Sequence, residues 1–264
     1  MSGMPVILAT PDTEQEGAEF GDLSISLSFP YQRVLAGLGA VPLILAGTVE
    51  REIIAESVRR CDGVLLTGGE DVEPRLYDRR MPARLREKAR LTPDGGQRDL
   101  RELLVIDEVF RQRKPLLAIC RGHQILNIAL GGSLVPDLAA RFPGGLNHRC
   151  MEQRAEVVHE ILLRPDSRLA GIVGRRTLGV NSTHHQAVAR VAPPLRAVAV
   201  SPDAVVEALE LKSALAHWLP FLLSVQFHPE RLADQHPAHR DIFKAFIEAA
   251  SPPVRREAGA PAVP

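Results

Sequence analysis

Short apolar runs alternate with longer amphipathic segments in the first half of the chain. The apolar runs have the length of buried strands and cover residues 6–9, 41–45, 63–67 and 115–119. Between them, apolar positions recur at helical spacing over residues 31–38, 52–59 and 94–113. Strands that alternate with helices indicate βαβ units, so the pattern predicts an α/β protein with a mostly parallel central sheet and helices on both faces.

The pattern changes after Gly131 and Gly132, where shorter β-rich segments begin. These segments cover residues 155–163, 177–180, 195–200, 205–211 and 221–227, and a last helix is expected at residues 237–250. No repeat or low-complexity linker divides the chain, so we expect a single domain over residues 1–250 with a β-rich C-terminal half. Residues 251–264 are rich in Pro and Ala and are expected to form a disordered tail.

Composition narrows the classes of partner. The 32 basic and 32 acidic side chains cancel, whereas a nucleic-acid-binding protein would show a basic excess. Three cysteines among 264 residues cannot form a closed set of disulfides, which favours a reducing, cytoplasmic location. The N-terminus lacks the features of a secretory signal, and no apolar run approaches the roughly 20 residues that span a bilayer. We therefore expect neither a nucleic-acid nor a membrane partner.

The sharpest local feature is a cysteine between an apolar run and an amphipathic segment. Residues 116–119 predict a buried strand, Cys120 follows at the turn, and Gly122 stands two positions later at the start of a predicted helix. This order is typical of a nucleophile elbow, in which a tight turn exposes the side chain and the glycine lets the helix pack closely. A helix N-terminus also favours thiolate over thiol. The alternative is a buried structural cysteine.

Two further segments could complete a catalytic site. His228, Pro229 and Glu230 follow an apolar strand, and alternate residues of an extended chain project to the same side, so a carboxylate could orient the imidazole. A polar turn is the alternative for this segment. Gly68 and Gly69 follow another predicted strand and could expose backbone N–H groups to an oxyanion, although paired glycines often only make turns.

Together these features resemble the class I glutamine amidotransferase superfamily. Within it, the chain is similar to the stand-alone γ-glutamyl hydrolases of the C26 peptidase group, such as γ-glutamyl-γ-aminobutyrate hydrolase. The segments that carry the resemblance are residues 67–77, 98–99, 119–124, 131–132, 180–186 and 225–230. They occur in the family's order and extend over about residues 5–250. The resemblance implies a flavodoxin-like fold, in agreement with the α/β pattern.

The resemblance also implies roles for individual residues. Cys120 matches the nucleophile, His228 the general base and acid, and Glu230 the residue that orients the histidine. The N–H groups of Gly69 and Arg121 would form the oxyanion hole. The residues implied in substrate binding are Gln124, Asn181 and His184. Asp71, Tyr77, Arg98 and Asp99 fit the subgroup without an assigned role, while Phe227 and Ala204 depart from it by replacing a frequent Trp and a usual Gly.

The implied activity is hydrolysis of a small-molecule γ-glutamyl amide through a cysteine thioester, without a cofactor. One alternative keeps the chemistry but makes the chain a glutaminase subunit that passes ammonia to a separate synthase. Another is a non-catalytic binding protein on the same fold. The sequence leaves open whether the chain forms a homo-oligomer.

Other polar clusters support no site at this stage. His184 and His185, with His148 and Cys150, could be metal ligands, but no Cys-x-x-Cys or His-x-x-x-His spacing accompanies them, so no metal site is expected. The residues expected in a solvated first turn of the last helix are His236 and His239. Residues 70–93 form the longest segment without clear periodicity, and we interpret their arginines as solvated surface rather than as a lid.

Overall fold

The computed structural model describes residues 3–17 and 20–251. The tail expected at residues 251–264 lies outside the described residues, apart from Ser251. Within the described part, none of the helices combines the length and the apolar character that crossing a bilayer requires.

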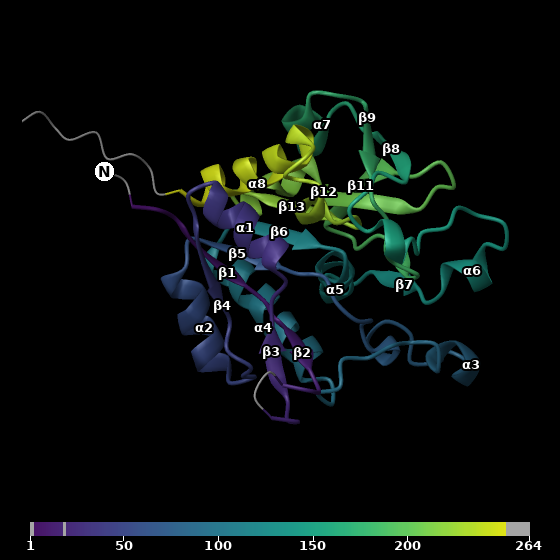
Figure 1. The fold of residues 1–264 in the computed structure, drawn as a ribbon, viewed down its shortest axis with the longest axis horizontal. Coiled ribbons are helices and arrows are strands. Elements are labelled where there is room, and N and C mark those ends of the chain that lie inside the picture. The colour runs from purple at the N-terminus through teal and green to yellow at the C-terminus, as the bar shows by residue number, and fades with distance from the viewer. Residues whose placement is uncertain (1–2, 18–19, 252–264) are drawn as a thin grey trace, which may run out of the picture.

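The centre of the molecule is a five-stranded parallel sheet (Figure 1). Its spatial order is β4 (Val41–Ile44), β1 (Val6–Ala9), β5 (Gly63–Leu66), β6 (Leu116–Ile119) and β13 (Leu222–Val225). The carboxyl ends of β6 and β13 lie side by side, because Ile119 pairs with Val225. In such a sheet, ligands bind beyond the carboxyl ends of the strands. The predicted α/β class and parallel centre are confirmed.

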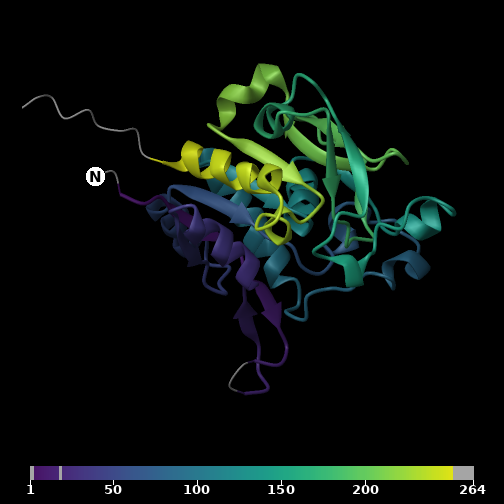
Figure 2. The ribbon, with the colours of Figure 1, turned by 45° about the horizontal axis from the view of Figure 1, so that its top comes forward.

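The β-rich second half extends this sheet with antiparallel strands. Beyond β13 follow β12 (Val206–Leu211), β11 (Leu195–Val200), β8 (His159–Leu163) and β9 (Thr177–Val180). A branch from β12 carries β10 (Ala187–Arg190) and β7 (Ser133–Val135), neither of which was predicted. Both halves of the chain therefore share one continuous sheet (Figure 2).

Helices cover both faces of the parallel strands. Successive residues of β1 alternate between two cores, since Ile7 and Ala9 pack on one side and Leu8 on the other. The first core is closed by α1 (Phe29–Gly37), α7 (Arg168–Val173) and α8 (Pro237–Ala250). The second is closed by α2 (Arg51–Arg60), α4 (Gln97–Gln112) and α5 (Arg121–Ala129). Each longer helix presents an apolar stripe to the sheet, as the spacing predicted.

The short elements were not predicted. They are the hairpin β2 (Asp12–Glu14) and β3 (Ser24–Ser26), the helices α3 (Ala83–Arg86) and α6 (Leu138–Arg141), and the 3₁₀ turns η1 (Pro74–Leu76), η2 (Met151–Gln153), η3 (Ser213–Trp218) and η4 (Pro229–Arg231). Such segments are too brief to show a period. The solvated position expected for His239 is wrong: its ring is buried, and its Nε2–H donates to the Gly179 carbonyl at 2.9 Å. His236 is partly exposed and precedes the first turn of α8.

Candidate active site

Cys120 lies at the junction between β6 and α5. Its backbone has φ 52° and ψ −102°, outside the regions that residues with a side chain ordinarily occupy. The turn is fixed on the strand side by a hydrogen bond of 2.8 Å from the Cys120 N–H to the Val225 carbonyl. The tight strand-to-helix turn predicted from the sequence is therefore present, and its backbone is strained at Cys120.

Gly122 allows α5 to start directly above β5. A Cβ at this position would lie 2.6 Å from the Leu66 carbonyl oxygen and 2.7 Å from the Leu66 Cβ, closer than real Cβ contacts. The Gly122 N–H donates to the Thr67 carbonyl at 3.1 Å, which fixes the first turn of the helix to the end of the strand. The close approach explains why glycine stands two residues after the cysteine.

His228 follows β13 and reaches the same end of the sheet. Its Nδ1 lies 2.7 Å from Glu230 Oε1, and both side chains are buried. Burial lowers the pKa of His228, but the charges of Glu230 and Cys120 and hydrogen bonds to both side chains outweigh it and raise the pKa to about 10. The arrangement therefore favours a protonated imidazole between a carboxylate and the Cys120 sulfur at neutral pH.

Asn181 holds the backbone of His228. Its Oδ1 accepts the His228 N–H at 2.8 Å, and its Nδ2 donates to the His228 carbonyl at 3.0 Å and to the Arg154 carbonyl at 2.7 Å. Its side chain is fully buried. A substrate contact by Asn181 stays a prediction, and these bonds favour a positioning role for the residue.

Two hydrogen bonds with remote residues fix the turn after β5. The Gly68 N–H donates to the Tyr31 hydroxyl at 3.0 Å, and the Arg98 Nη2 donates to the Gly68 carbonyl at 2.6 Å. Gly69 has φ +147°, which disfavours any side chain there. Among the described residues, the N–H groups of Gly69 and Arg121 donate to no acceptor, so both are free to bind an oxyanion.

Buried ion pairs hold the two sides of this region together. The Arg121 guanidinium contacts the carboxylates of Asp99 and Glu102, both on α4. Arg98 is fully buried and pairs with Asp12 and with Glu102. This network gives Arg98 and Asp99 the structural role that the sequence did not supply, because only the folded chain shows that their charges meet Arg121.

A pocket of about 130 Å³ opens beside Cys120. It is lined by both signs of charge, since Glu70, Asp71, Arg90 and Arg149 all contribute to it. The other lining residues are Gly69, Cys120, Gln124, Met151, Thr183, His184, His185 and Gln186. From the 70–93 loop, only Glu70, Asp71 and Arg90 line this pocket. Arg84 and Lys88 of the same loop line a separate pocket against α6.

Comparisons with known proteins identify the family of the chain. The family model described as Peptidase C26 matches residues 5–230. This chain belongs to the peptidase C26 family. The resemblance inferred from the motifs is thereby confirmed.

Relatives of this C26 chain carry related names. It is 35% identical over 192 residues to Protein NtpR of Enterococcus hirae, which covers 72% of this chain and 76% of that protein. It is 32% identical over 238 residues to the gamma-glutamyl-gamma-aminobutyrate hydrolase PuuD of Escherichia coli, covering 87% and 88%. A glutamine amidotransferase from Methylobacillus flagellatus shares the fold, with TM-score 0.55 and 15% identity over 94% and 96% of the two chains. The C26 chain is thus a hydrolase of the glutamine amidotransferase-like kind.

Gln226 is a site residue that the sequence analysis missed. Its Nε2 donates to the Cys120 sulfur at 3.6 Å, and its Oε1 accepts from Gln124 Nε2 at 3.1 Å. Gln124 Nε2 also donates to the Gln186 carbonyl at 3.2 Å. The signal available in the sequence was a lone amide between Val225 and Phe227, directly after the apolar residues of β13; the structure shows that Gln226 is fully buried.

The two adjacent histidines of this C26 chain, His184 and His185, face different neighbouring side chains. His185 Nε2 lies 2.8 Å from Asp71, whose hydrogen bond is the main cause that raises the pKa of His185. His184 instead turns its Nε2 toward Glu207. No role could be assigned to Asp71 from the sequence, and the structure pairs it with His185.

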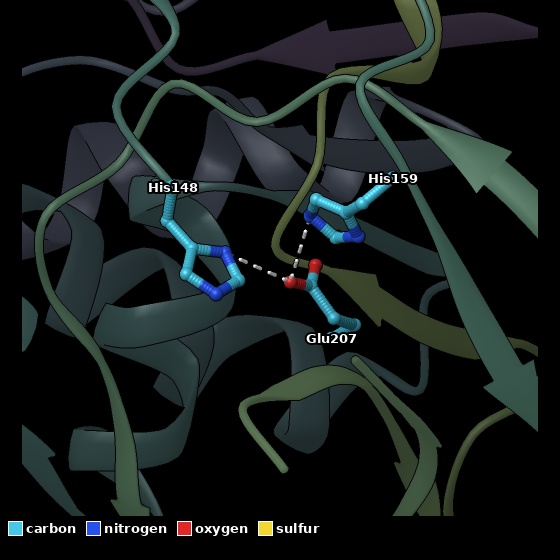
Figure 3. A group of neighbouring side chains, drawn as sticks. All are labelled: His148, His159 and Glu207. Atoms are coloured by element: carbon cyan, nitrogen blue, oxygen red, sulfur yellow. Dashed lines mark ion pairs between the residues drawn. The ribbon is translucent and has the colours of Figure 1, made fainter. Parts of the chain in front are cut away.

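A cluster behind His184 could hold a metal ion. His148, His159 and Glu207 offer ligand atoms that all lie within 4.8 Å of one another (Figure 3). Burial raises the pKa of the Glu207 carboxyl to about 8 and lowers the pKa of His159. The expectation of no metal site considered His148 and His184 but not His159 or Glu207, which only the fold brings to them. Cys150 is not part of this cluster, since its thiol donates to the Asn147 carbonyl.

Proposed function

We propose that this C26 chain hydrolyses γ-glutamyl amides of small amines through a thioester on Cys120. The observation that carries the proposal is the strained Cys120 at a helix N-terminus, beside a buried His228 that is hydrogen-bonded to Glu230. The relatives named gamma-glutamyl-gamma-aminobutyrate hydrolase support this substrate class.

The steps follow from the positions of the groups. Cys120 sulfur, as thiolate, attacks the γ-carbonyl carbon, while the N–H groups of Gly69 and Arg121 stabilise the oxyanion. The His228 imidazolium gives its proton to the amine nitrogen as the C–N bond breaks, which leaves a γ-glutamyl thioester. Neutral His228 then takes a proton from water, the hydroxide attacks the thioester, and glutamate leaves as the thiolate and imidazolium are restored. No cofactor enters these steps.

The charged residues around the pocket complement the γ-glutamyl group, which is common to all such substrates. A γ-glutamyl group carries an α-carboxylate and an α-ammonium on the same carbon. Arg90 and Arg149 offer partners for the carboxylate, and Glu70 and Asp71 offer partners for the ammonium. Gln124 lies in the same pocket, where its amide can contact the glutamyl chain.

The test is release of glutamate by the purified chain from γ-glutamyl-γ-aminobutyrate, other γ-glutamyl amines, γ-glutamyl peptides and glutamine. We expect kcat/KM to be higher for amides with bulky amines than for glutamine, because ammonia uses none of the binding energy of an outer pocket. Cys120→Ala should reduce turnover to background, a loss on the order of 10⁶-fold. Mass spectrometry of a denatured reaction should detect the γ-glutamyl adduct on Cys120.

Matched cysteine variants give the control. Cys61 is buried away from the site, and Cys150 contacts Asn147, so Cys61→Ala and Cys150→Ala should keep the rate of the unmodified chain. Turnover that survives Cys120→Ala would contradict the proposal. A preference for glutamine, switched on by another protein or a nucleotide, would instead support a glutaminase that supplies ammonia to a synthase. Tight substrate binding without turnover would support a binding protein.

A further inference from the structure

Glu207, on β12, is a fully buried carboxylate without ordinary partners. Within residues 3–17 and 20–251, neither of its side-chain oxygens has a hydrogen-bond partner. A buried carboxylate without compensation is costly, so a group of this kind requires a proton or a cation. Its place in the fold is close to the candidate active site, because its backbone carbonyl accepts the Gln226 N–H at 2.8 Å.

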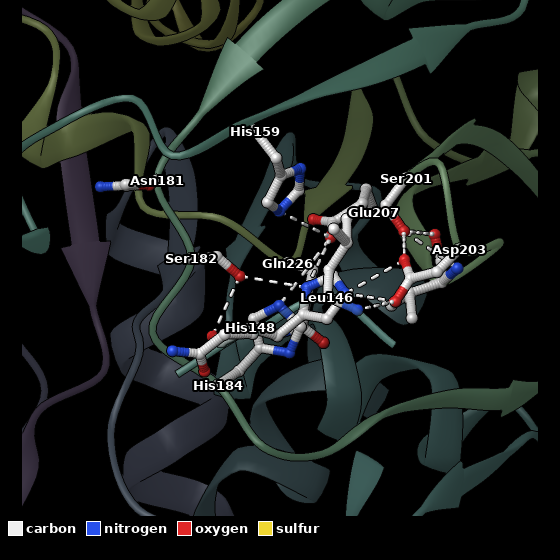
Figure 4. A network of polar contacts seen from close by, with 12 residues as sticks. Leu146, His148, His159, Asn181, Ser182, His184, Ser201, Asp203, Glu207 and Gln226 are labelled. Atoms are coloured by element: carbon white, nitrogen blue, oxygen red, sulfur yellow. Dashed lines mark hydrogen bonds and ion pairs between the residues drawn. The ribbon is translucent and has the colours of Figure 1, made fainter. Parts of the chain in front are cut away.

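Three imidazole nitrogens surround the same oxygen of Glu207. His148 Nδ1 lies 3.6 Å from Oε1, and the Nε2 atoms of His159 and His184 each lie 3.8 Å from it (Figure 4). The Nε2 atoms of His159 and His184 are buried and, within the described part of the chain, have no hydrogen-bond partner. The distances are too long for hydrogen bonds.

The opposite nitrogen of each ring fixes which side carries the proton. His184 Nδ1 lies 2.8 Å from the Gln186 carbonyl, and His159 Nδ1 lies 3.2 Å from the Glu160 carbonyl. Carbonyl oxygens only accept hydrogen bonds, so each Nδ1 carries the hydrogen and each Nε2 turns a lone pair toward Glu207. This orientation by an outer acceptor is typical of histidines that bind metals.

His148 follows the same rule through its other nitrogen. Its Nε2 lies 3.2 Å from both oxygens of Asp203, which accept the N–H and leave the lone pair on Nδ1. The Ser182 hydroxyl lies 3.2 Å from this Nδ1 and 3.0 Å from the His148 carbonyl, so it can donate to the carbonyl when Nδ1 has another partner. A carboxylate behind a histidine is a frequent arrangement at zinc sites.

We propose that these residues bind a divalent cation of the zinc class in a closed, four-ligand site. The ligands are His148 Nδ1, His159 Nε2, His184 Nε2 and Glu207 Oε1. A single proton on Glu207 could form a hydrogen bond to only one of the three imidazole nitrogens. A cation could bind all three nitrogens and the Glu207 carboxylate at once. In a tetrahedral zinc site with bonds near 2.1 Å, ligand atoms lie about 3.4 Å apart. The ligand atoms of His148, His159 and Glu207 lie within 4.8 Å of one another, so these three side chains must close around the cation and the His184 ring must move toward it to complete the set.

A site of this kind has a structural role. Four protein ligands leave no open position for water, which is typical of structural rather than catalytic zinc. The ligands come from the segment before Cys150, from β8, from β12 and from the segment that reaches Gln186 beside the pocket. The cation would therefore fix the 181–186 segment against the β-rich half. The inference rests on these contacts and is independent of the proposed hydrolase reaction.

The decisive experiment is a zinc titration of the untagged chain. The background is Cys120→Ala with Cys150→Ser, which removes the active-site thiol and the half-buried thiol as competing ligands. After stripping with a chelator, Zn²⁺ is added in competition with a chromophoric chelator at neutral pH. We expect one equivalent per chain, and Co²⁺ in its place should give the intense visible absorption of tetrahedral coordination.

Variants locate the site. Glu207→Gln and His159→Gln keep the size of the side chain but remove a ligand, and each should weaken zinc affinity by more than 100-fold. Asp203→Asn removes the negative charge behind His148, at a carboxylate that also accepts from Ser201 and Leu146, and should weaken affinity by about 10- to 100-fold. The matched control is His217→Gln, which removes an exposed histidine from η3 and should retain one equivalent of zinc. Circular dichroism reports whether each variant is folded.

Two results would overturn the inference. One is the absence of stoichiometric zinc binding by the background chain, which would mean that a proton on Glu207, and not a cation, stabilises the cluster. This result does not depend on whether the ligand variants fold. The other is equal affinity in the background chain and in folded Glu207→Gln, which would place the bound ion elsewhere.

Discussion

Glu230 determines the charge of His228. The carboxylate lies 2.7 Å from Nδ1, in surroundings that exclude water, and its charge is the largest of the causes that raise the pKa of His228. Without this carboxylate, less would offset the desolvation that lowers the pKa of His228. In the proposed mechanism, protonated His228 is the acid for the leaving amine, so Glu230 extends the pH range in which this acid exists.

A first prediction concerns Glu230→Gln, which removes the charge and retains the shape. For the unmodified chain, kcat/KM should fall on the alkaline side as His228 loses its proton near pH 10. In the variant this limb should move to lower pH, because the pKa of His228 falls. The maximal rate should also fall, but by about two orders of magnitude less than in Cys120→Ala. The measurement is kcat/KM from pH 5 to 11.

The control for this profile is Glu248→Gln, an exposed position on α8. It should leave both the alkaline limb and the maximal rate unchanged. An unshifted limb in Glu230→Gln would assign the titration to a group other than His228.

At the scale of elements, the junction between β6 and α5 depends on one missing side chain. The helix approaches β5 so closely that a methyl group at Gly122 would meet the Leu66 carbonyl, which is backbone and cannot rotate away. We expect Gly122→Ala to lower the free energy of unfolding by about 1–3 kcal/mol. Because the shift would displace the Arg121 N–H, kcat should fall as well. Chemical denaturation and steady-state kinetics measure the two effects.

A second glycine provides the matched control. Gly171 lies within α7, is exposed, and has open space where a Cβ would stand. Gly171→Ala should raise stability by about 0.4–1 kcal/mol and leave kcat unchanged, because alanine reduces the entropy of the unfolded chain. If both variants behaved alike, the close contact at Gly122 would not be the cause.

Contiguity explains which elements could be predicted from the sequence. The β6–Cys120–α5 junction lies within one continuous stretch, residues 116–124, so its strand, turn and helix were all predicted. The long helices and the central strands were predicted as well. The strands β7 and β10 are three and four residues long and gain their stability from pairing with each other, which no local pattern records. Gln226 and Glu207 were missed for a related reason: a polar residue in an apolar strand reveals its partner only after folding.

At the scale of the whole molecule, a buried ionic network joins three parts of the chain. Glu102 on α4 contacts both Arg98 and Arg121, and Arg98 reaches Asp12 of the β2–β3 hairpin. Glu102 is fully buried. Its removal would leave the buried guanidinium groups of Arg98 and Arg121 with fewer partners. The free-energy cost of these uncompensated charges exceeds the net stabilisation that the ion pairs provide.

The corresponding prediction is that Glu102→Gln lowers the free energy of unfolding by about 3–5 kcal/mol. An exposed pair offers the comparison: Glu56 contacts Arg59 and Arg60 on the surface of α2, and Glu56→Gln should leave stability nearly unchanged. Urea denaturation followed by circular dichroism measures both variants. Equal effects would mean that burial of the network does not govern its contribution.

All the groups of the proposed reaction come from this one chain and meet at one edge of one sheet. Gly69 follows β5, Cys120 follows β6 and His228 follows β13. Hydrogen bonds with Tyr31 and Arg98 fix the backbone of Gly68 beside Gly69, and a hydrogen bond to Asn181 fixes the backbone of His228. We therefore expect this chain alone to assemble the nucleophile, the acid and the oxyanion donors. The rate of glutamate release per chain should therefore stay constant over a range of protein concentrations and when nucleotides or synthase-like proteins are added. Kinetics with and without these additions measure it, and a rate that rises several-fold with an added partner would show that the site is completed from outside the chain.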